Sequence, residues 1–200
     1  SSAITIDQTI TNNSNITLGQ ISIDNAAGYT VLGTGTISMQ TNTGNATILV
    51  ANGSQTLTPS GLTFKSNTDI SIPGTKLTIG GTSTGVTIDP GVTVNFAGEG
   101  NVNIVGPIHN NGNLVLNINA DGNHFYGWYA IDSIDGPGTT DITRTKLIIH
   151  QATTTDVLNS ILSNQLTSSS LTSSIYALGL LSGSDYIALH GTTVPGETIS

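Results

Sequence analysis

Residues 48–116 carry one short apolar-x-apolar unit four times, as Ile48-Leu49-Val50, Ile70-Ser71-Ile72, Val92-Thr93-Val94 and Leu114-Val115-Leu116. The starting positions 48, 70, 92 and 114 are evenly spaced, and a weaker column, Phe64, Val86 and Ile108, has the same interval. The residues between the units are mostly Gly, Asn, Thr, Ser and Pro, which form turns. A constant period near twenty residues predicts a mainly β fold, a β-solenoid (β-helix) whose stacked coils share one core.

The chain divides around this stretch into three regions. Residues 1–47 are predicted to form N-terminal strands that cap the solenoid, residues 48–119 regular coils of about 22 residues, and residues 120–200 an aromatic-rich turn region, short helices and a final strand. Apolar residues alternate with polar ones in the first region, which is typical of half-buried strands. Its first segment, residues 3–10, is either the first rung of the solenoid or an extended arm that pairs with another subunit.

The C-terminal region has a different period. The residues that fit one helical face are Val157, Leu158, Ile161, Leu162 and Leu166. Thr155 or Asp156 is the expected N-cap of this helix. A second short helix is predicted over residues 171–181, and a last strand over residues 186–189.

A second fold explains the alternation equally well. It is a β-sandwich of pilin type in which residues 3–10 are the donated N-terminal strand. This fold leaves the constant interval between the apolar units as a coincidence, so the β-solenoid is the preferred prediction.

Charge and cysteine content exclude several classes of protein. Only 8% of the residues are charged, and 12 acidic residues against 4 basic ones give a net charge of −8. Nucleic-acid binding is not expected because it needs a basic surface. The chain has no Cys, so thiol chemistry and disulfides are excluded. No apolar run reaches the roughly 18 residues of a membrane span, so we expect no membrane insertion.

The remaining composition indicates an exported protein. Thr, Ser, Asn and Gly make the chain soluble in place of charged residues, which is typical of extracellular proteins. The sequence begins at Ser1 without a methionine, and we therefore expect a processed product whose leader has been removed. The expected localisation is extracellular or at the cell surface.

Titratable residues offer little for catalysis. The acid pairs that could serve a glycosidase or a lyase are Asp132 with Asp135 and Asp89 with Glu99, but they lie among turn residues, where Asp serves local hydrogen bonding. The histidines, His109, His124, His150 and His190, are scattered without the spacing of a metal pair. Segments 121–123 and 132–135 could supply oxygens to calcium, although neither matches a calcium loop. We expect no enzyme activity, no cofactor and no metal.

Aromatic residues gather in one short segment. Phe125, Tyr126, Trp128 and Tyr129 are either a patch that binds a glycan or a receptor, or residues that cap the solenoid or form a subunit junction. Four Asn-x-Ser/Thr triplets are candidate glycosylation acceptors, and they begin at Asn12, Asn15, Asn45 and Asn52.

Segments 85–96 and 112–118 are rich in Gly, Asn and Thr between short apolar units. In this they resemble the passenger regions of bacterial autotransporters and filamentous-haemagglutinin-type exoproteins. The resemblance covers roughly residues 30–120 and is compositional. It implies an exported β-solenoid used for adhesion or surface structure, whereas the short length and the helical C-terminal part depart from it.

Three functions follow as hypotheses. In the first, the open strand edges at the ends of the solenoid pair with other copies, which gives a filament or surface assembly. In the second, the chain is a monomeric adhesin that binds a glycan or a host protein. In the third, it is a carbohydrate-active β-helix enzyme. The first, a non-enzymatic structural or adhesive protein that partners itself, is the preferred expectation.

Overall fold

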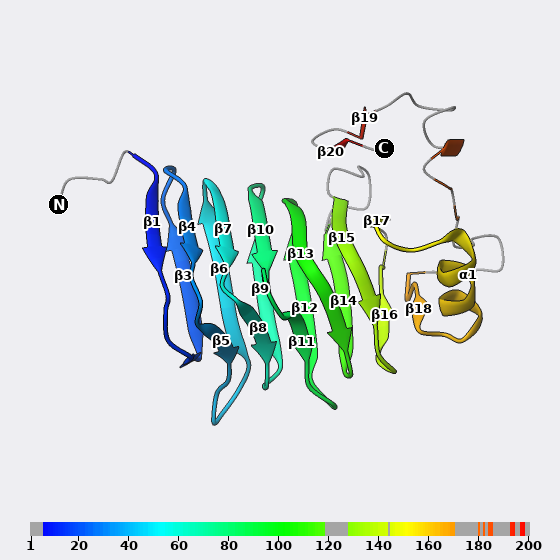
Figure 1. The fold of residues 1–200 in the computed structure, drawn as a ribbon, viewed down its shortest axis with the longest axis horizontal. Coiled ribbons are helices and arrows are strands. Elements are labelled where there is room, and N and C mark those ends of the chain that lie inside the picture. Colours follow the sequence, from blue (N-terminus) through cyan, green and yellow to red (C-terminus); the bar gives the residue numbers. More distant parts are fainter. Residues whose placement is uncertain are drawn as a thin grey trace.

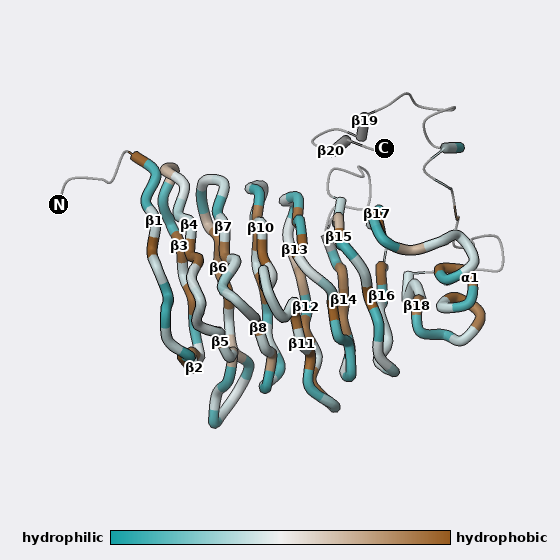
Figure 2. The backbone as a smooth tube through the Cα atoms, viewed as in Figure 1, coloured by the Kyte–Doolittle hydropathy of each residue, from teal (hydrophilic) through white to brown (hydrophobic). Residues whose placement is uncertain are grey.

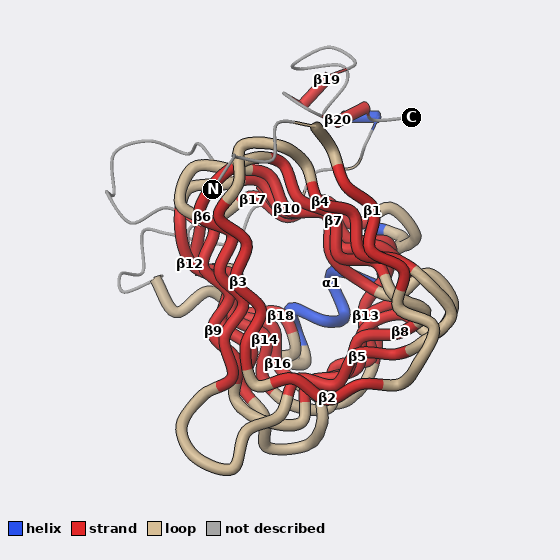
Figure 3. Tube along the Cα trace, turned by 90° about the vertical axis from the view of Figure 1, so that its left-hand side faces the viewer, coloured by secondary structure: helices blue, strands red, loops and turns tan. Residues whose placement is uncertain are grey.

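The computed structural model describes residues 6–118, 128–143 and 145–170, together with residues 180, 182, 184–185, 193–194 and 197–198. The fold is mainly β, with 56% strand, and is a β-solenoid of about six turns with one short C-terminal helix. The coils follow one another along the long axis (Figure 1), and seen from the end they enclose a three-sided bore (Figure 3). The predicted β-solenoid is confirmed, and the alternative β-sandwich is not the fold.

Each of the first six coils contributes a strand, or half of a long strand, to each of three faces, and neighbouring coils pair in parallel. The first face consists of β1 (Gln8–Thr11), β4 (Tyr29–Leu32), β7 (Ser54–Thr58), β10 (Lys76–Gly80), the first halves of β13 (Asn101–Asn110) and β15 (Trp128–Asp135), and β17 (Lys146–Ile149). The second consists of β2 (Ile16–Leu18), β5 (Thr36–Met39), β8 (Gly61–Phe64), β11 (Gly85–Ile88) and the second halves of β13 and β15. The third consists of β3 (Gln20–Asp24), β6 (Ala46–Asn52), β9 (Thr68–Ile72), β12 (Thr93–Gly98), β14 (Asn113–Ile118), β16 (Thr139–Asp141) and β18 (Leu166–Thr167).

Inward-facing side chains of successive coils stack in columns and fill the bore. One column on the second face contains the register partners Ile37, Leu62, Val86 and Ile108, none of which is more than 4% exposed. Thr63 and Thr87, which follow Leu62 and Val86, lie on the outer side because successive strand residues point to opposite faces. Figure 2 shows the resulting alternation of hydrophobic and hydrophilic residues along the coils. Burial of these columns is the main source of stability.

The length of a coil is not constant, in contrast to the predicted fixed interval. The predicted interval is correct for the partners Ile48 and Ile70. The interval between register partners is longer in the next coil, because Ile70 pairs with Phe96 and not with Val92. It is shorter in the coil after that, because Val94 pairs with Leu114. Both differ from the predicted interval by an even number of residues, which leaves the inward pattern unchanged, so corners of different length are compatible with the same core.

The N-terminal strands belong to the same solenoid. β1, β2 and β3 form the first coil, and Ile16 of β2 pairs with Ile37 of β5. Gln8–Thr11 is therefore the first rung of the solenoid, which was one of the two alternatives for this segment.

Helix α1 (Thr154–Leu162) lies at the other end, between β17 and β18 in sequence. The predicted N-cap at Thr155 or Asp156 is wrong, because Thr153 caps the helix and forms a capping box with Asp156. Hydrogen bonds from the Thr153 hydroxyl and backbone N–H lower the pKa of Asp156. Leu166, predicted on the helix, belongs to β18.

The C-terminal predictions fall almost entirely outside the described residues. They are the second helix over residues 171–181 and the last strand over residues 186–189. The short strands β19 (Thr193–Val194) and β20 (Glu197–Thr198) pair antiparallel with each other.

Candidate functional site

The two acids Asp132 and Asp135 occupy different environments on β15. Asp132 accepts a hydrogen bond of 2.7 Å from the backbone N–H of Gly106. Gly106 lies at the point where the pairing of β13 with β15 shifts in register, between Ile104 and Pro107. Asp132 thus compensates for the irregular ladder with its carboxylate.

Asp135 faces solvent together with His109. Its Oδ1 lies 2.8 Å from Nδ1 of His109, and the two side chains are 61% and 43% exposed. A polar contact between side chains this exposed contributes little to stability. The structure therefore does not bring Asp132 and Asp135 together as a catalytic pair.

Asp89 and Glu99 lie at different corners of the same coil. Asp89 follows β11 and Glu99 follows β12, so the strand β12 lies between them. Such a strand is about 20 Å long, which is too far for two carboxylates to act on one bond. Within the described part of the chain, no three His, Cys, Asp or Glu side chains are grouped so that they could hold a metal ion.

Other predicted ligand residues have separate positions. His150 follows β17, whereas His124, His190 and segment 121–123 lie outside the described residues.

The aromatic segment is only partly described, and its described members are buried. Tyr129 is 0% exposed and packs inside the bore, where burial raises the pKa of its hydroxyl. Trp128 is 4% exposed and clusters with Ala130, with Ile148 packed against them. Phe125 and Tyr126 lie outside the described residues. The burial of Trp128 and Tyr129 therefore agrees better with a structural role than with an exposed binding patch.

The four glycosylation candidates differ in accessibility. The side-chain nitrogen of Asn12 is buried, whereas Asn15, Asn45 and Asn52 are exposed. The Asn45 amide donates to Asp69 across 2.8 Å, and the Asn52 amide donates to Asp24 across 2.5 Å. Only the three exposed asparagines present a side chain that a modifying enzyme could reach in the folded protein.

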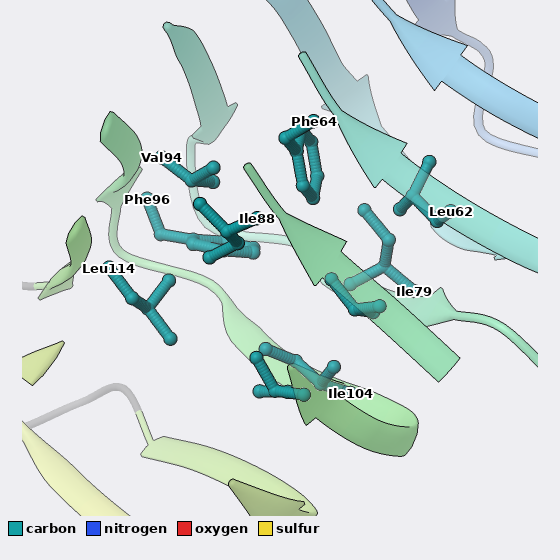
Figure 4. Close-up of a pocket in the computed structure, with 10 residues that line it drawn as sticks. Leu62, Phe64, Ile79, Ile88, Val94, Phe96, Ile104 and Leu114 are labelled. Carbon is teal, nitrogen blue, oxygen red and sulfur yellow. The ribbon is translucent and has the colours of Figure 1, made fainter. Parts of the chain in front are cut away.

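The interior of the central coils is closely packed. Figure 4 shows apolar side chains from all three faces pointing toward one another. The void that they line has a volume of about 10 Å³. A buried water requires about that volume together with polar partners, and this lining is apolar.

A larger groove of about 280 Å³ lies at the C-terminal end, between the sixth coil and α1. Its floor includes Ile134 and Leu166, and two polar side chains in its wall are already engaged. Asn110 donates to the carbonyl of Thr139, and Gln165 donates to the carbonyl of Gly136.

At the other end of the solenoid, no described strand stacks on the first coil. The inward-facing apolar residues of the first coil are Ile10, Ile16, Leu18, Ile21 and Ile23, and we refer to these five side chains with the outer edges of β1, β2 and β3 as the first-coil end. Their register partners in the second coil include Ile37, Met39 and Ile48, each at most 1% exposed, whereas Ile10 is 49% exposed. Within the described residues, no strand pairs with the outer edges of β1, β2 and β3.

The first-coil end could be foreseen only in part. The sequence predicts open strand edges and identifies the alternation through Ile16, Leu18 and Ile21. It does not show whether residues 3–10 are the first rung or an extended arm, because both alternatives predict the same alternation of apolar and polar residues.

The described chain contains no helix with the length and hydropathy of a membrane span. Comparison with protein-family models, curated proteins and solved structures found no match to this chain.

Proposed function

We propose that this chain is an extracellular or cell-surface protein with a structural or adhesive, non-enzymatic role, and that it associates with itself through strand edges. The observation that carries the proposal is the first-coil end, where an apolar cross-section and three strand edges lack a partner among the described residues. Unpaired backbone groups beside exposed apolar side chains are the usual template for strand addition.

The first-coil strands contain neither Lys nor Pro, two of the features that usually protect a free edge, and the pairing of β3 with β6 shifts in register between Ile23 and Asp24. Proteins block such edges with Lys, Pro or bulges. The three strands of the first coil read QTIT, ITL and QISID, with neither Lys nor Pro. The Ile10 side chain remains 49% exposed at this end. Pairing of this end would bury apolar area and satisfy backbone groups at the same time.

The outer surface supports an extracellular role. Two columns of hydroxyl side chains run along the solenoid, one through Thr30, Thr56 and Thr78 and one through Ser38, Thr63 and Thr87. Neighbouring members are about 4.8 Å apart, as strands in a sheet are. Hydroxyls therefore supply solubility along these columns in place of charge, and the solenoid itself agrees with the resemblance to exoprotein passenger regions.

The two other hypotheses have less support. A monomeric adhesin that uses the aromatic segment would need exposed rings, but Trp128 and Tyr129 are buried. A carbohydrate-active enzyme would need convergent acids, but Asp132 bonds to Gly106 and Asp135 lies beside His109.

Light scattering across a concentration range, together with negative-stain electron microscopy, tests the proposal. We expect an associated fraction that increases with concentration and that the substitution Ile10→Lys abolishes, because it places a charge in the apolar cross-section. Thr78→Lys adds the same charge to the outer side of β10 and serves as the matched control, with association unchanged. Monomers at every concentration would overturn the proposal.

A further inference from the structure

We propose that the first-coil ends of two copies meet about a two-fold axis, so that association stops at a closed pair. This inference rests on the proposed function and names its partner, a second copy of this chain, and its geometry. A closed pair differs from a filament, in which the first coil of one copy would stack on the last coil of the next.

The two ends of the solenoid are not equivalent. At the C-terminal end, β17 and β18 continue the first and third faces, but α1 takes the place of a strand on the second face. Figure 3 shows α1 across the bore when the solenoid is viewed along its axis, and Figure 1 places it at the C-terminal end. Among the described residues, a coil that stacked here would meet two strand edges and a helix, so head-to-tail pairing through them is incomplete.

The helix also changes the chemistry of the C-terminal end. Val157 and Ile161 are half-buried, whereas Leu158 and Leu162 are 46% and 72% exposed and cannot pair with a strand. The groove of about 280 Å³ beside α1 further interrupts this surface. A flat coil would leave that volume unfilled, with loss of packing contacts.

A second first-coil end offers the matching surface. It presents three strand edges around one apolar cross-section, and another coil of the same shape can pair with all three at once. Rotation about an axis perpendicular to the solenoid reverses the strand direction, so the pairs formed across the interface are antiparallel. Antiparallel ladders are at least as stable as parallel ones, and the contact uses the same surface on both copies.

The two-fold arrangement determines which strands meet. The two-fold axis passes through one of the three faces, so the first-coil strand of that face pairs with its own copy. The strands of the other two faces then pair with each other. Head-to-tail stacking would pair none of the three with itself.

The charge at this end predicts how salt acts on the pair. Asp7 and Asp24 flank the first-coil strands, and residues 6–24 include no Lys or Arg. Bringing two copies together places like charges near one another, and salt screens such repulsion. Association through the first-coil end therefore strengthens as the salt concentration rises.

Single-cysteine variants test the arrangement, because the natural chain has no Cys. Thr9→Cys, Thr17→Cys and Ser22→Cys each place one thiol on a first-coil strand, and Ser163→Cys places one just after α1. A short thiol-specific crosslinker is applied to each variant and to each mixture of two. Thr78→Cys, on the outer side of β10, is the matched control.

We expect one of the three first-coil variants to crosslink with itself, and the other two to crosslink with each other in a mixture. Light scattering should then give a dimer and no larger species. Crosslinks between Ser163→Cys and a first-coil variant, together with growing assemblies, would overturn the closed pair and leave self-association in place. A monomer at all concentrations without crosslinks would overturn both.

Discussion

The rings of Phe96 and Tyr129 meet edge to face inside the bore, with centroids 5.7 Å apart and planes at 83°. Phe96 comes from β12 on the third face and Tyr129 from β15 on the first, so the contact joins two faces across the core. Tyr129 is 0% exposed, and its hydroxyl has no hydrogen-bond partner among the described residues. An aromatic residue that could stack on a sugar at the surface is thus part of the core.

Tyr129→Phe should raise the free energy of unfolding. The ring contact with Phe96 is kept, while a buried hydroxyl without a described partner is removed, and such a group costs about 1–3 kcal/mol. We expect a gain of about 1 kcal/mol in urea unfolding. Tyr29→Phe, at a half-buried position, should change stability less, and a loss of stability in Tyr129→Phe would show that the hydroxyl has a partner.

The same residue predicts a loss of stability at high pH. Burial raises the pKa of Tyr129 above the ordinary value of about 10, so the folded state holds the proton where the unfolded state releases it. The stabilisation is complete below pH ~10 and is lost as the pH rises above it, by up to about 1.4 kcal/mol per pH unit. Between pH 9 and 11, the free energy of unfolding should fall less steeply with pH for Tyr129→Phe than for the unsubstituted chain. Equal pH dependence in the two proteins would contradict the conclusion that ionisation of Tyr129 destabilises the fold.

Gln55→Leu should destabilise the first three coils. Gln55 is 1% exposed, accepts a hydrogen bond from the backbone N–H of Tyr29, and donates to the carbonyls of Asn25, Ala27 and Asn52. Leu would leave these buried groups without partners, at a cost of about 2–3 kcal/mol. Thr56 is the next residue and lies on the outer side. Thr56→Ala is the control, and it should change the free energy of unfolding by no more than about 0.5 kcal/mol. Similar effects for the two variants would refute the role of Gln55.

Asp132→Ala and Asp135→Ala should differ in stability although the residues lie on one strand. Asp132 bonds to the Gly106 N–H at the irregular point of the ladder, and a charge-assisted bond of this kind is worth about 1.5–3 kcal/mol. The exposed Asp135–His109 pair is worth about 0–1 kcal/mol. Thermal unfolding of both variants measures the difference, and a larger loss for Asp135→Ala would be inconsistent with these contacts.

Gly80→Ala should be far more damaging than Gly74→Ala. Both glycines have positive φ, +150° and +80°. A Cβ on Gly80 would lie 2.1 Å from the carbonyl oxygen of Val105 in the next coil, whereas a Cβ on Gly74 has nothing within 4 Å. Gly74→Ala therefore costs about 1–2 kcal/mol of backbone strain alone, and Gly80→Ala should prevent the two coils from stacking. Urea unfolding of both variants measures the difference. Equal unfolding midpoints would contradict the close approach of Gly80 to Val105 in the next coil.

Much of the fold follows from the sequence because inward residues recur every second position and turn residues separate the strands. The partner of Ile70 could not be predicted, since Val92, Val94 and Phe96 all fit an apolar column when corners vary in length. The role of Asp132 depends on Gly106, which is brought opposite by the coil length and not by any local pattern.

The start of α1 shows a similar limit. Thr153, Thr154, Thr155 and Asp156 all suit an N-cap, and only the reciprocal bonds of Thr153 with Asp156 select Thr153. The first-coil end could be anticipated as an open edge, but its apolar cross-section is recognisable only once the register places Ile10 beside Val31.

Hydrogen–deuterium exchange at two protein concentrations tests self-association through the first-coil end most directly. Residues 8–24 form β1, β2 and β3, whose outer edges would gain hydrogen bonds on association, whereas residues 146–167 include β17, α1 and β18 at the other end. We predict that exchange in residues 8–24 slows as the concentration rises, with residues 146–167 unchanged. Exchange in residues 8–24 that is independent of concentration would contradict the proposed function.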